Sequence, residues 1–432
     1  MPQVPFLNRQ ALHLRPDPTR VIVRPFKPAT EPRDLNPTDK TRANHIVERV
    51  LALDPDTAAH QLADVLENFL GRHRNLLQTF EARAAEMEEA LADHAAFTQT
   101  QRQLVGAYFL NEYSFEASAL FNPSIVAHPD QSGKPEGSLR FVLSLRAVGE
   151  GHVSSLTFRS GLIAADGTVN VDPTSRLASS PGIVRPASGA GGDDIDVTFA
   201  TGEDISERVI FPVTEAQSNG IEDARFVQFS GAEQKIYYAT YTAYSGRAIR
   251  SELIETSDFV SFRLSTLNGN AARNKGMALF PKKIDGKYAM IARQDNENLY
   301  LIYSDDLYTW DGGQPILKPR YPWEFVQIGN CGSPIELDEG WLLLTHGVGP
   351  VRKYSIGAAL LDKNDPSKVL ARLREPLLRP DPSEREGYVP NVVYTCGAMR
   401  HRDKIIFPYA VSDTFCNFAT IEIASLIASL DR

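Results

Sequence analysis

A short motif recurs in the second half of the chain, and its spacing restricts the folds that this part can adopt. The segment Thr256–Phe262 (TSDFVSF) resembles Tyr303–Trp310 (YSDDLYTW), and the two copies are about 47 residues apart. Fainter copies lie about two periods upstream, at Ala165–Gly167, and about one period downstream, at Leu361–Asp362. A period of ~40–50 residues is typical of one four-stranded blade of a β-propeller.

The strand pattern around this repeat agrees with such a fold. After Ser114, short runs rich in β-branched and aromatic residues alternate with turns, and little helix separates them. The chain of 432 residues also exceeds the size at which a single core usually divides. We therefore expect an all-β five-bladed propeller over residues 114–432. The clearest strands are Leu139–Leu145, Ser154–Phe158, Ile236–Tyr241, Tyr288–Ala292, Leu299–Tyr303, Trp341–Thr345 and Lys404–Tyr409.

Residues 1–113 have a different character, and we expect an N-terminal arm and an α-helical extension. Residues 1–40 are rich in Pro and Arg and predict an extended arm. Apolar spacing then predicts one helix before Asp54, a second capped by Asp56 and ended by Gly71, and a third from Asn75 to Tyr108. The helices carry an apolar stripe that favours a homo-oligomer, although packing on the propeller is an equal alternative. The stripe comprises Leu62, Val65, Phe69, Leu76 and Phe80.

Composition excludes several classes of function. The formal net charge of −9 and the absence of a basic tract argue against nucleic-acid binding. We see neither a secretory signal nor an apolar run long enough to span a membrane, and three cysteines fit a reducing compartment, so a cytoplasmic protein is expected. The nine histidines are scattered, which predicts no metal site and no cofactor. The Gly-rich segment at 187–192 lacks a following Lys-Ser/Thr and predicts a loop.

Polar clusters occur about once per expected blade, as a single site on the propeller axis would require. One of them, Gly220–Arg225, contains adjacent carboxylates at Glu222 and Asp223, which point to opposite faces of an ideal strand. Only one would then face the channel, with Arg225 on the same side as Asp223. Neighbouring carboxylates also favour one protonated carboxyl near neutral pH, as a general acid requires. A structural Asp–Arg pair is the alternative.

These clusters resemble motifs of glycoside hydrolase family 130, the β-mannoside phosphorylases and hydrolases. Gly220–Arg225 is similar to the family's Gly-x-Glu-Asp-Pro-Arg, and Leu279–Ile284 to its Leu-Phe-Pro-Glu-Lys-Ile. Gly340–Val348 resembles Gly-Trp-Leu-Leu-x-Tyr-His-Gly-Val, and Tyr388–Gly397 resembles Val-Pro-Asn-Val-Val-Phe-x-Cys-Gly. The end of Tyr409–Asp413 matches the aspartate of Tyr-Gly-Ala-Ala-Asp. Several motifs in one order make the resemblance specific.

The resemblance implies a five-bladed propeller that acts on an oligosaccharide or disaccharide β-mannoside with inversion. The phosphorylases use inorganic phosphate as co-substrate and release α-mannose 1-phosphate, whereas the hydrolases use water. Asp223 matches the catalytic acid, and Lys275 and His346 match phosphate-contacting positions. We expect sugar contacts from Asn122, Arg146, Arg225, Tyr241 and Asp413, and phosphate contacts from Lys275, Arg293 and His346. Further available cations are Arg247, Arg250 and Arg352, and Tyr244, Trp323, Tyr354 and Tyr388 are aromatic residues that can stack on a sugar.

Other reactions stay open at this point. A hydrolase needs a second carboxylate to activate water, and the candidates are Glu324, Glu384 and Glu386. A sugar-binding propeller without activity is a further alternative. The chain departs from the family pattern at Gly276 (Asp in the family), Ala292 (His) and Lys282 (Glu), and the last change alters a charge that we expect near the site. These departures leave the linkage and the acceptor sugar open.

Overall fold

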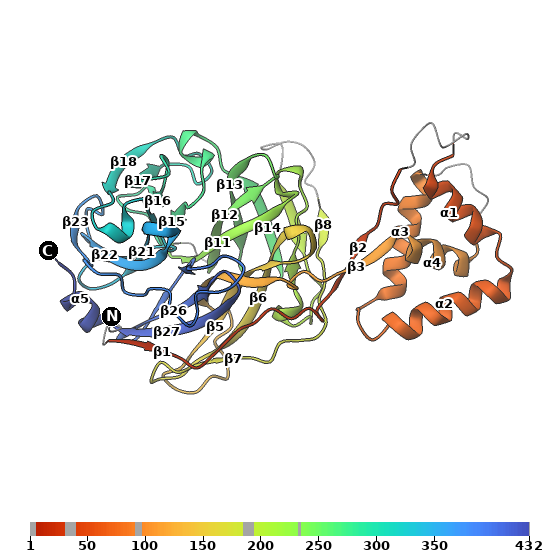
Figure 1. Ribbon diagram of the computed structural model, residues 1–432, viewed down its shortest axis with the longest axis horizontal. Coiled ribbons are helices and arrows are strands. Elements are labelled where there is room, and N and C mark those ends of the chain that lie inside the picture. Colours follow the sequence, from red (N-terminus) through yellow and green to blue (C-terminus); the bar gives the residue numbers. More distant parts are fainter. Residues whose placement is uncertain (1–5, 31–39, 91–96, 185–193, 232–234, 432) are drawn as a thin grey trace. The chain divides into compact units, whose positions relative to one another are not determined.

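The chain folds into two compact units, one built mainly from β-sheets and one from α-helices (Figure 1). The computed structural model describes residues 6–30, 40–90, 97–184, 194–231 and 235–431. The sheet unit comprises residues 1–18, 115–174 and 181–432, and the helical unit comprises residues 19–114 and 175–180. The first 18 residues therefore group with the sheets and not with the helices. The Gly-rich segment 187–192 lies outside the described residues.

The sheet unit begins with an 11-stranded sheet, which we treat as two antiparallel sheets because a single residue pair joins its two parts. The first is β4 (Ala119–Ala127), β5 (Leu139–Val148), β6 (Ser154–Ile163) and β7 (Val169–Val171), with β10 (Val209–Ile210) also on β6. The second is β11 (Gly220–Phe229), β12 (Ile236–Tyr244), β13 (Ile249–Thr256) and β14 (Ser261–Thr266), extended by β9 (Ile195–Thr198) and β8 (Gly182–Val184). A single parallel pair, Gly220 with Ser154, joins the two.

Three more sheets follow in the same manner. The third is β15 (Ala278–Leu279), β16 (Tyr288–Ala292), β17 (Leu299–Ser304) and β18 (Gly313–Leu317). The fourth is β19 (Gln327–Asn330), β21 (Trp341–Val348), β22 (Tyr354–Leu361) and β23 (Val369–Arg372), with β20 (Ile335–Glu336) on β21. The fifth is β24 (Val393–Tyr394), β26 (Lys404–Val411) and β27 (Phe415–Glu422), with β25 (Met399–His401) on β26. Helix α5 (Ile423–Ala428) follows β27, and single 3₁₀ turns lie at Glu150–His152, Ile205–Glu207, Glu215–Gln217, Asn270–Arg273, Pro322–Glu324 and Pro350–Arg352.

The N-terminal segment completes the fifth sheet. Strand β1 (Leu7–Arg9) pairs antiparallel with β27, with Leu7 opposite Ile421, and both side chains are buried. The first part of the expected surface arm is therefore a sheet strand. No local pattern predicts this, because the pairing joins residues more than 400 positions apart and depends on the whole sheet unit being folded.

Apolar faces of neighbouring sheets pack against one another. Phe158 of β6 stacks on Phe262 of β14, with ring centroids 5.6 Å apart, and meets Phe259 edge-on. Strand β21 is buried along its whole length, as expected for a strand covered on both faces. Such strands form a rigid frame for polar side chains at their ends.

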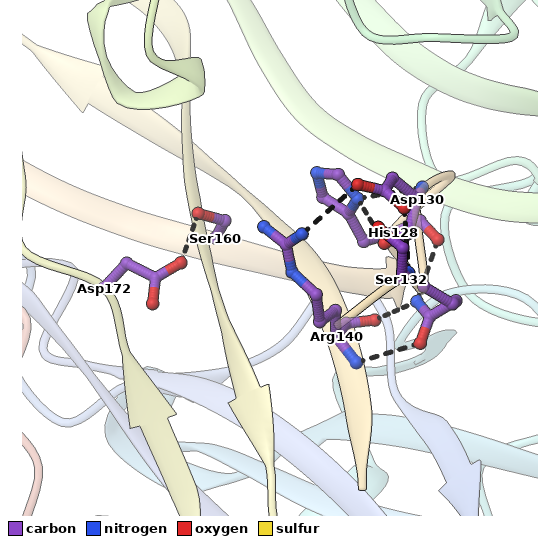
Figure 2. A network of polar contacts seen from close by, with 7 residues as sticks. His128, Asp130, Ser132, Arg140, Ser160 and Asp172 are labelled. Atoms are coloured by element: carbon purple, nitrogen blue, oxygen red, sulfur yellow. Dashed lines mark hydrogen bonds and ion pairs between the residues drawn. The ribbon is translucent and has the colours of Figure 1, made fainter. Parts of the chain in front are cut away.

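A polar network closes the turn between β4 and β5 (Figure 2). His128 Nδ1 accepts the Asp130 N–H at 3.0 Å, and the Asp130 carboxylate accepts the Ser132 N–H at 2.8 Å and faces the Arg140 guanidinium. Beside it, Ser160 donates to Asp172 at 2.6 Å. These contacts join residues of the turn to one another, so we assign the network a structural role.

The helical unit contains α1 (Arg42–Leu51), α2 (Pro55–Phe69), α3 (Leu76–Ala90) and α4 (Gln99–Tyr108), and a two-stranded sheet of β2 (Ile22–Pro25) and β3 (Leu110–Tyr113). Two predictions for it are wrong. Helix α2 is capped by Asp54, whose carboxylate accepts the Thr57 N–H, because Pro55 fits the first helical position. The third expected helix is two helices, since Thr98 and Gln101 form a capping box that starts α4.

Among the described residues, none of the helices is long and apolar enough to cross a bilayer.

Candidate functional site

A polar cavity of about 250 Å³ lies where the first strands of the five sheets come together. Each sheet contributes to its lining near its first strand: Asn122 from β4, Asp223 from β11, Lys275 just before β15, Asn330 from β19 and Tyr394 from β24. Charged and amide side chains predominate in the lining. Residues spread over more than 270 positions therefore meet in one place, as the once-per-blade polar clusters predicted.

Matching β-bulges aim two of these side chains into the cavity. On β4 the pairing shifts between Phe121 and Ser124, and on β11 it shifts between Glu222 and Arg225. The residues at the bulges, Asn122 and Asp223, have left-handed backbones with φ of 49° and 55°. Asn and Asp tolerate this conformation better than other residues, and such strain gathers at functional sites.

The bulge overturns the expected alternation of Glu222 and Asp223. Both carboxylates line the cavity, and Arg146 binds both, with Nη2 2.6 Å from Glu222 Oε1 and Nη1 3.3 Å from Asp223 Oδ1. The Arg146 guanidinium lies over the Phe121 ring and donates from Nε to Ser154. These contacts fix the Arg146 guanidinium, which in turn holds both carboxylates in place.

Arg225 supports Asp223 from behind. Its Nη1 donates to the Asp223 carbonyl at 3.0 Å, and its Nη2 donates to the Tyr394 hydroxyl at 2.9 Å. The side chain is buried. Although Arg225 lines the cavity as predicted, these bonds show that it also stabilises the left-handed backbone that presents Asp223.

The electrostatics differ from the sequence-based expectation for Asp223. Burial alone would raise its pKa, but Arg146, Lys275 and Arg225 outweigh burial and hold the pKa of Asp223 below its ordinary value. The carboxyl with a raised pKa is Asp413: burial, with Asp223 adding to it against the opposing Arg146, brings its pKa to about 7. The carboxyl whose pKa approaches neutrality is therefore Asp413 and not Asp223.

Part of the cavity lining, the cationic side, carries three positively charged side chains. Lys275, Arg293 and Arg352 all line it, and within the described residues no carboxylate lies in ion-pair distance of their side chains. Position 276 is a glycine with φ of 95°, and a Cβ built on it would lie 4.0 Å from Arg293 Cβ. An aspartate at this position, as in the family pattern, would place a carboxylate beside Arg293. With Gly276 at this position, no side chain from residue 276 meets Arg293.

Hydroxyl groups of the second sheet hold the loop that carries Lys275. Thr240 of β12 donates to the Met277 carbonyl, and Ser251 of β13 donates to the Asn274 carbonyl at 2.6 Å. The Asn274 side chain in turn accepts the Lys275 N–H at 2.8 Å and donates to Asn296 at 2.7 Å. The position of Lys275 is therefore set by the sheet.

His346 of β21 lies on the cationic side, packed between aromatic rings. It stacks on Tyr354 with ring centroids 5.8 Å apart and meets Tyr394 at 4.8 Å. Burial, assisted by Arg293 and Arg225, lowers the pKa of His346 well below its ordinary value. His346 is therefore neutral near pH 7, and the expected phosphate-contacting residue does not add a positive charge.

Comparisons with known proteins agree with this site. The sequence model of the family described as beta-1,4-mannooligosaccharide phosphorylase (Glyco_hydro_130) matches residues 200–432, more than half of the chain. The chain belongs to glycoside hydrolase family 130. The 1,2-beta-oligomannan phosphorylase of a Thermoanaerobacter species is 38% identical over 227 residues, which cover 51% of this chain and 75% of that protein.

Two more relatives from Listeria innocua extend the comparison. A beta-1,2-mannobiose phosphorylase is 34% identical over 232 residues, which cover 51% of this chain and 63% of that protein. The solved structure of a beta-1,2-mannobiose phosphorylase with beta-1,2-mannobiose superposes with a TM-score of 0.50 at 22% identity, over 72% of this chain and 92% of that one. This likeness shows a shared, mostly β fold. The helical unit and Asn122 and Arg146 lie outside the sequence match at 200–432.

Most of the expected site residues of this family 130 chain meet in the cavity. They are Asn122, Arg146, Asp223, Arg225, Lys275, Arg293, His346 and Asp413. Tyr241 does not: it lies opposite the bulge of β11, is buried in the core, and bonds through its hydroxyl to Gln217 and Glu252. The side chain of Tyr241, which was expected to contact the sugar, therefore lies in the hydrophobic core.

The candidate hydrolytic bases all lie outside the cavity lining. Glu324 is buried against Arg372 at 2.5 Å, Glu384 pairs with Arg9 at 3.0 Å, and Glu386 is exposed. Lys282 is also outside the lining, because it pairs with Glu336 at 2.8 Å and lies over Trp341. The expected charge change near the site at Lys282 is therefore wrong.

Sequence reasoning missed several lining residues or gave them no role. Arg352 and Tyr354 were only two of several available cations and aromatics, and Glu222 was expected to face away. Arg352 lies in a turn after β21 with a left-handed backbone, φ of 54°, which no local pattern announces. The others are Phe121, Gly276, Gln327, Gly329, Asn330, Val392 and Tyr394. Within the described part of the chain, no three His, Cys, Asp or Glu side chains group as metal ligands would.

Proposed function

We propose that this protein is an inverting β-mannoside phosphorylase that transfers a mannosyl group to inorganic phosphate and forms α-mannose 1-phosphate. One observation carries the proposal: Lys275, Arg293 and Arg352 have no carboxylate within ion-pair distance among the described residues and line the same cavity as Asp223. Unpaired cations with hydrogen-bond donors suit a phosphate dianion, which needs several charges at once. The relatives named as mannoside phosphorylases support the same reaction.

In the proposed reaction, a phosphate oxygen attacks the anomeric carbon from the face opposite the glycosidic oxygen. The bond from the anomeric carbon to that oxygen breaks, and the leaving oxygen receives a proton from Asp223, directly or through a sugar hydroxyl. Overall, the proton of the hydrogen phosphate ion replaces the mannosyl group on the leaving sugar. Asn122 and Asp413 are placed to bind the mannosyl hydroxyls, since both present their side chains to the cavity beside Asp223.

Phosphate binding would also prepare Asp223 to act as an acid. In the structure, Lys275 and Arg225 help to keep its pKa low. A dianion bound to Lys275 cancels part of this positive field, so the pKa of Asp223 rises when phosphate is present. Proton donation is thereby coupled to the arrival of the nucleophile, which favours phosphorolysis over hydrolysis.

We further infer that the sheet unit is a five-bladed propeller. Five sheets follow in chain order, the first strand of each lies near the cavity, and β1 completes the last sheet next to β27. Closure of the last blade by an N-terminal strand would hold the ring together. An experimental structure with another number of blades, or with an open ring, would contradict this inference.

Hydrolysis is the alternative reaction, and the described site offers it less support. The bases expected from the sequence, Glu324, Glu384 and Glu386, lie outside the cavity lining; Glu222 and Asp413 do line it, but the three unpaired cations beside them suit phosphate rather than water. The test is incubation with β-1,2-, β-1,3- and β-1,4-mannobiose, with and without phosphate, starting with the β-1,2 linkage named for the relatives. We expect mannose 1-phosphate only when phosphate is present. Equal release of mannose without phosphate would indicate a mannosidase, and sugar binding without turnover would indicate a binding propeller.

We propose that the helical unit mediates a homo-oligomer. It contains an apolar hollow of about 400 Å³ lined in part by Val65, Phe69, Leu76 and Phe80, and Leu70 and Tyr108 are exposed. Sedimentation at micromolar concentration tests this proposal, and a monomer would contradict it. A cytoplasmic location likewise stays a proposal, supported by three free cysteines.

A further inference from the structure

The protonation of His346 is determined by its hydrogen bond to the neighbouring strand. Its Nδ1 lies 3.1 Å from the carbonyl oxygen of Asn330, which can only accept a hydrogen bond. Nδ1 therefore carries the hydrogen, and a neutral imidazole then has a lone pair on Nε2. The low pKa of His346 agrees with a neutral ring.

The Nε2 atom has no hydrogen-bond partner among the described residues. The side chain is only 3% exposed and lines the cavity, and Tyr354 and Tyr394 hold its ring from two sides. Gly329 leaves room for the ring, since a Cβ there would lie 2.5 Å from Nε2. Nε2 is thus an acceptor held in one position by a residue of the cavity lining.

This acceptor belongs to the cationic side of the cavity. Asn330, which orients His346, also donates from its side chain to the Ile291 carbonyl, two residues before Arg293. Arg293 and Arg225 are the charged groups with the largest influence on the His346 ring. Among so many donors, a fixed acceptor matches a ligand that itself carries a hydrogen, and a hydrogen phosphate ion meets this requirement as well as that of negative charge.

We propose that His346 Nε2 accepts a hydrogen bond from the hydroxyl of a hydrogen phosphate ion and so selects phosphate over tetrahedral dianions without a hydroxyl. The inference rests on the proposed function, because it assigns the phosphate to this side of the cavity. Sulfate and monofluorophosphate have the same charge as hydrogen phosphate and a similar shape, but both would place a bare oxygen or fluorine against the Nε2 lone pair. Lone-pair repulsion then replaces a hydrogen bond.

The experiment measures the binding of phosphate, sulfate and monofluorophosphate to the full chain by calorimetry at about pH 8, where all three are dianions. We expect the wild type to bind phosphate roughly 10- to 100-fold more tightly than either of the others, the range expected for one hydrogen bond to a charged group. His346→Gln should bring the three affinities within about threefold, because the carboxamide can present either an N–H or an oxygen. Arg293→Gln should weaken all three and keep their ratio.

The wild-type comparison alone can overturn the inference, so it does not depend on a variant that folds. Equal binding of the three anions would refute it, as would a ratio that His346→Gln leaves unchanged. If mannoside turnover requires phosphate while sulfate competes equally well, the role of His346 fails and the proposed function stands. If turnover needs no phosphate and none of the anions binds, both fail.

Discussion

Replacement of Asp413 is expected to raise the stability of the protein at high pH and to abolish its activity. The pKa of Asp413 rises from 3.8 to about 7 in the folded protein, chiefly because the carboxyl is buried. The native state therefore holds a proton that the unfolded state releases, and stability falls as the pH rises from about 4 to about 7. Replacement by the neutral isostere, Asp413→Asn, removes this penalty and should stabilise the protein at high pH.

The magnitude follows from the pKa values. Each pH unit between the unfolded and the folded pKa costs about 1.4 kcal/mol, so about three units give an upper limit of ~4 kcal/mol at pH 8. Since Asp413 is partly exposed at the cavity, we expect an observed gain of roughly 1–3 kcal/mol at pH 8 and less than half of it at pH 5. Mannoside turnover should be lost in the same variant.

The assay is the thermal midpoint of Asp413→Asn and of the wild type at pH 5 and pH 8 in buffers without phosphate. Asp403→Asn is the matched control, because Asp403 is exposed on the β25–β26 turn and its side chain makes no hydrogen bond among the described contacts. The control should shift the midpoint little at either pH. The reasoning is refuted if the gain in thermal midpoint of Asp413→Asn over the wild type is no larger at pH 8 than at pH 5.

Three other predictions address the site. Asp223→Asn should keep the fold and lower turnover by roughly 10²–10⁴, the usual range for loss of general acid catalysis, and unchanged steady-state turnover would exclude Asp223 from the mechanism. Tyr241→Phe should lower the free energy of unfolding by about 1–3 kcal/mol without a change in the KM for mannoside, because its hydroxyl satisfies buried Gln217 and Glu252. Ser251→Ala should raise the KM for phosphate about 3- to 10-fold and leave the KM for mannoside nearly constant, since it frees the loop that carries Lys275; equal changes in both constants would argue against a positioning role.

The sequence predicted which segments form the site better than it predicted their geometry. Motifs such as Gly220–Arg225 identified segments that lie next to the cavity. When similar sheets repeat around one site, equivalent segments of different sheets come together. The bulge at Asp223 was not predictable, because the bulge breaks the two-residue alternation that the argument used. For the same reason Glu222 lines the cavity, whereas Tyr241 lies in the core because its hydroxyl bonds there to Gln217 and Glu252.

Two features of the fold were predicted wrongly from the sequence, for different reasons. The pairing of Leu7 with Ile421 depends on contacts between distant parts of the chain, so no window of sequence contains it. The start of α4, in contrast, was readable: Thr98 and Gln101 have the spacing of a capping box, which the longer apolar pattern obscured. The pKa values of Asp223 and Asp413 belong to the first kind, since they depend on burial in a cavity that several sheets form and on charged groups from those sheets.

The central claim is that the cavity joins a mannosyl group to phosphate with inversion. The most direct measurement is proton and phosphorus NMR of the reaction with β-1,2-mannobiose and phosphate, followed from the first turnovers. The account predicts α-mannose 1-phosphate as the first product, with one mannose released for each phosphate consumed and no reaction when phosphate is omitted. Mannose formed at the same rate without phosphate, or a β-configured phosphate ester, would contradict it.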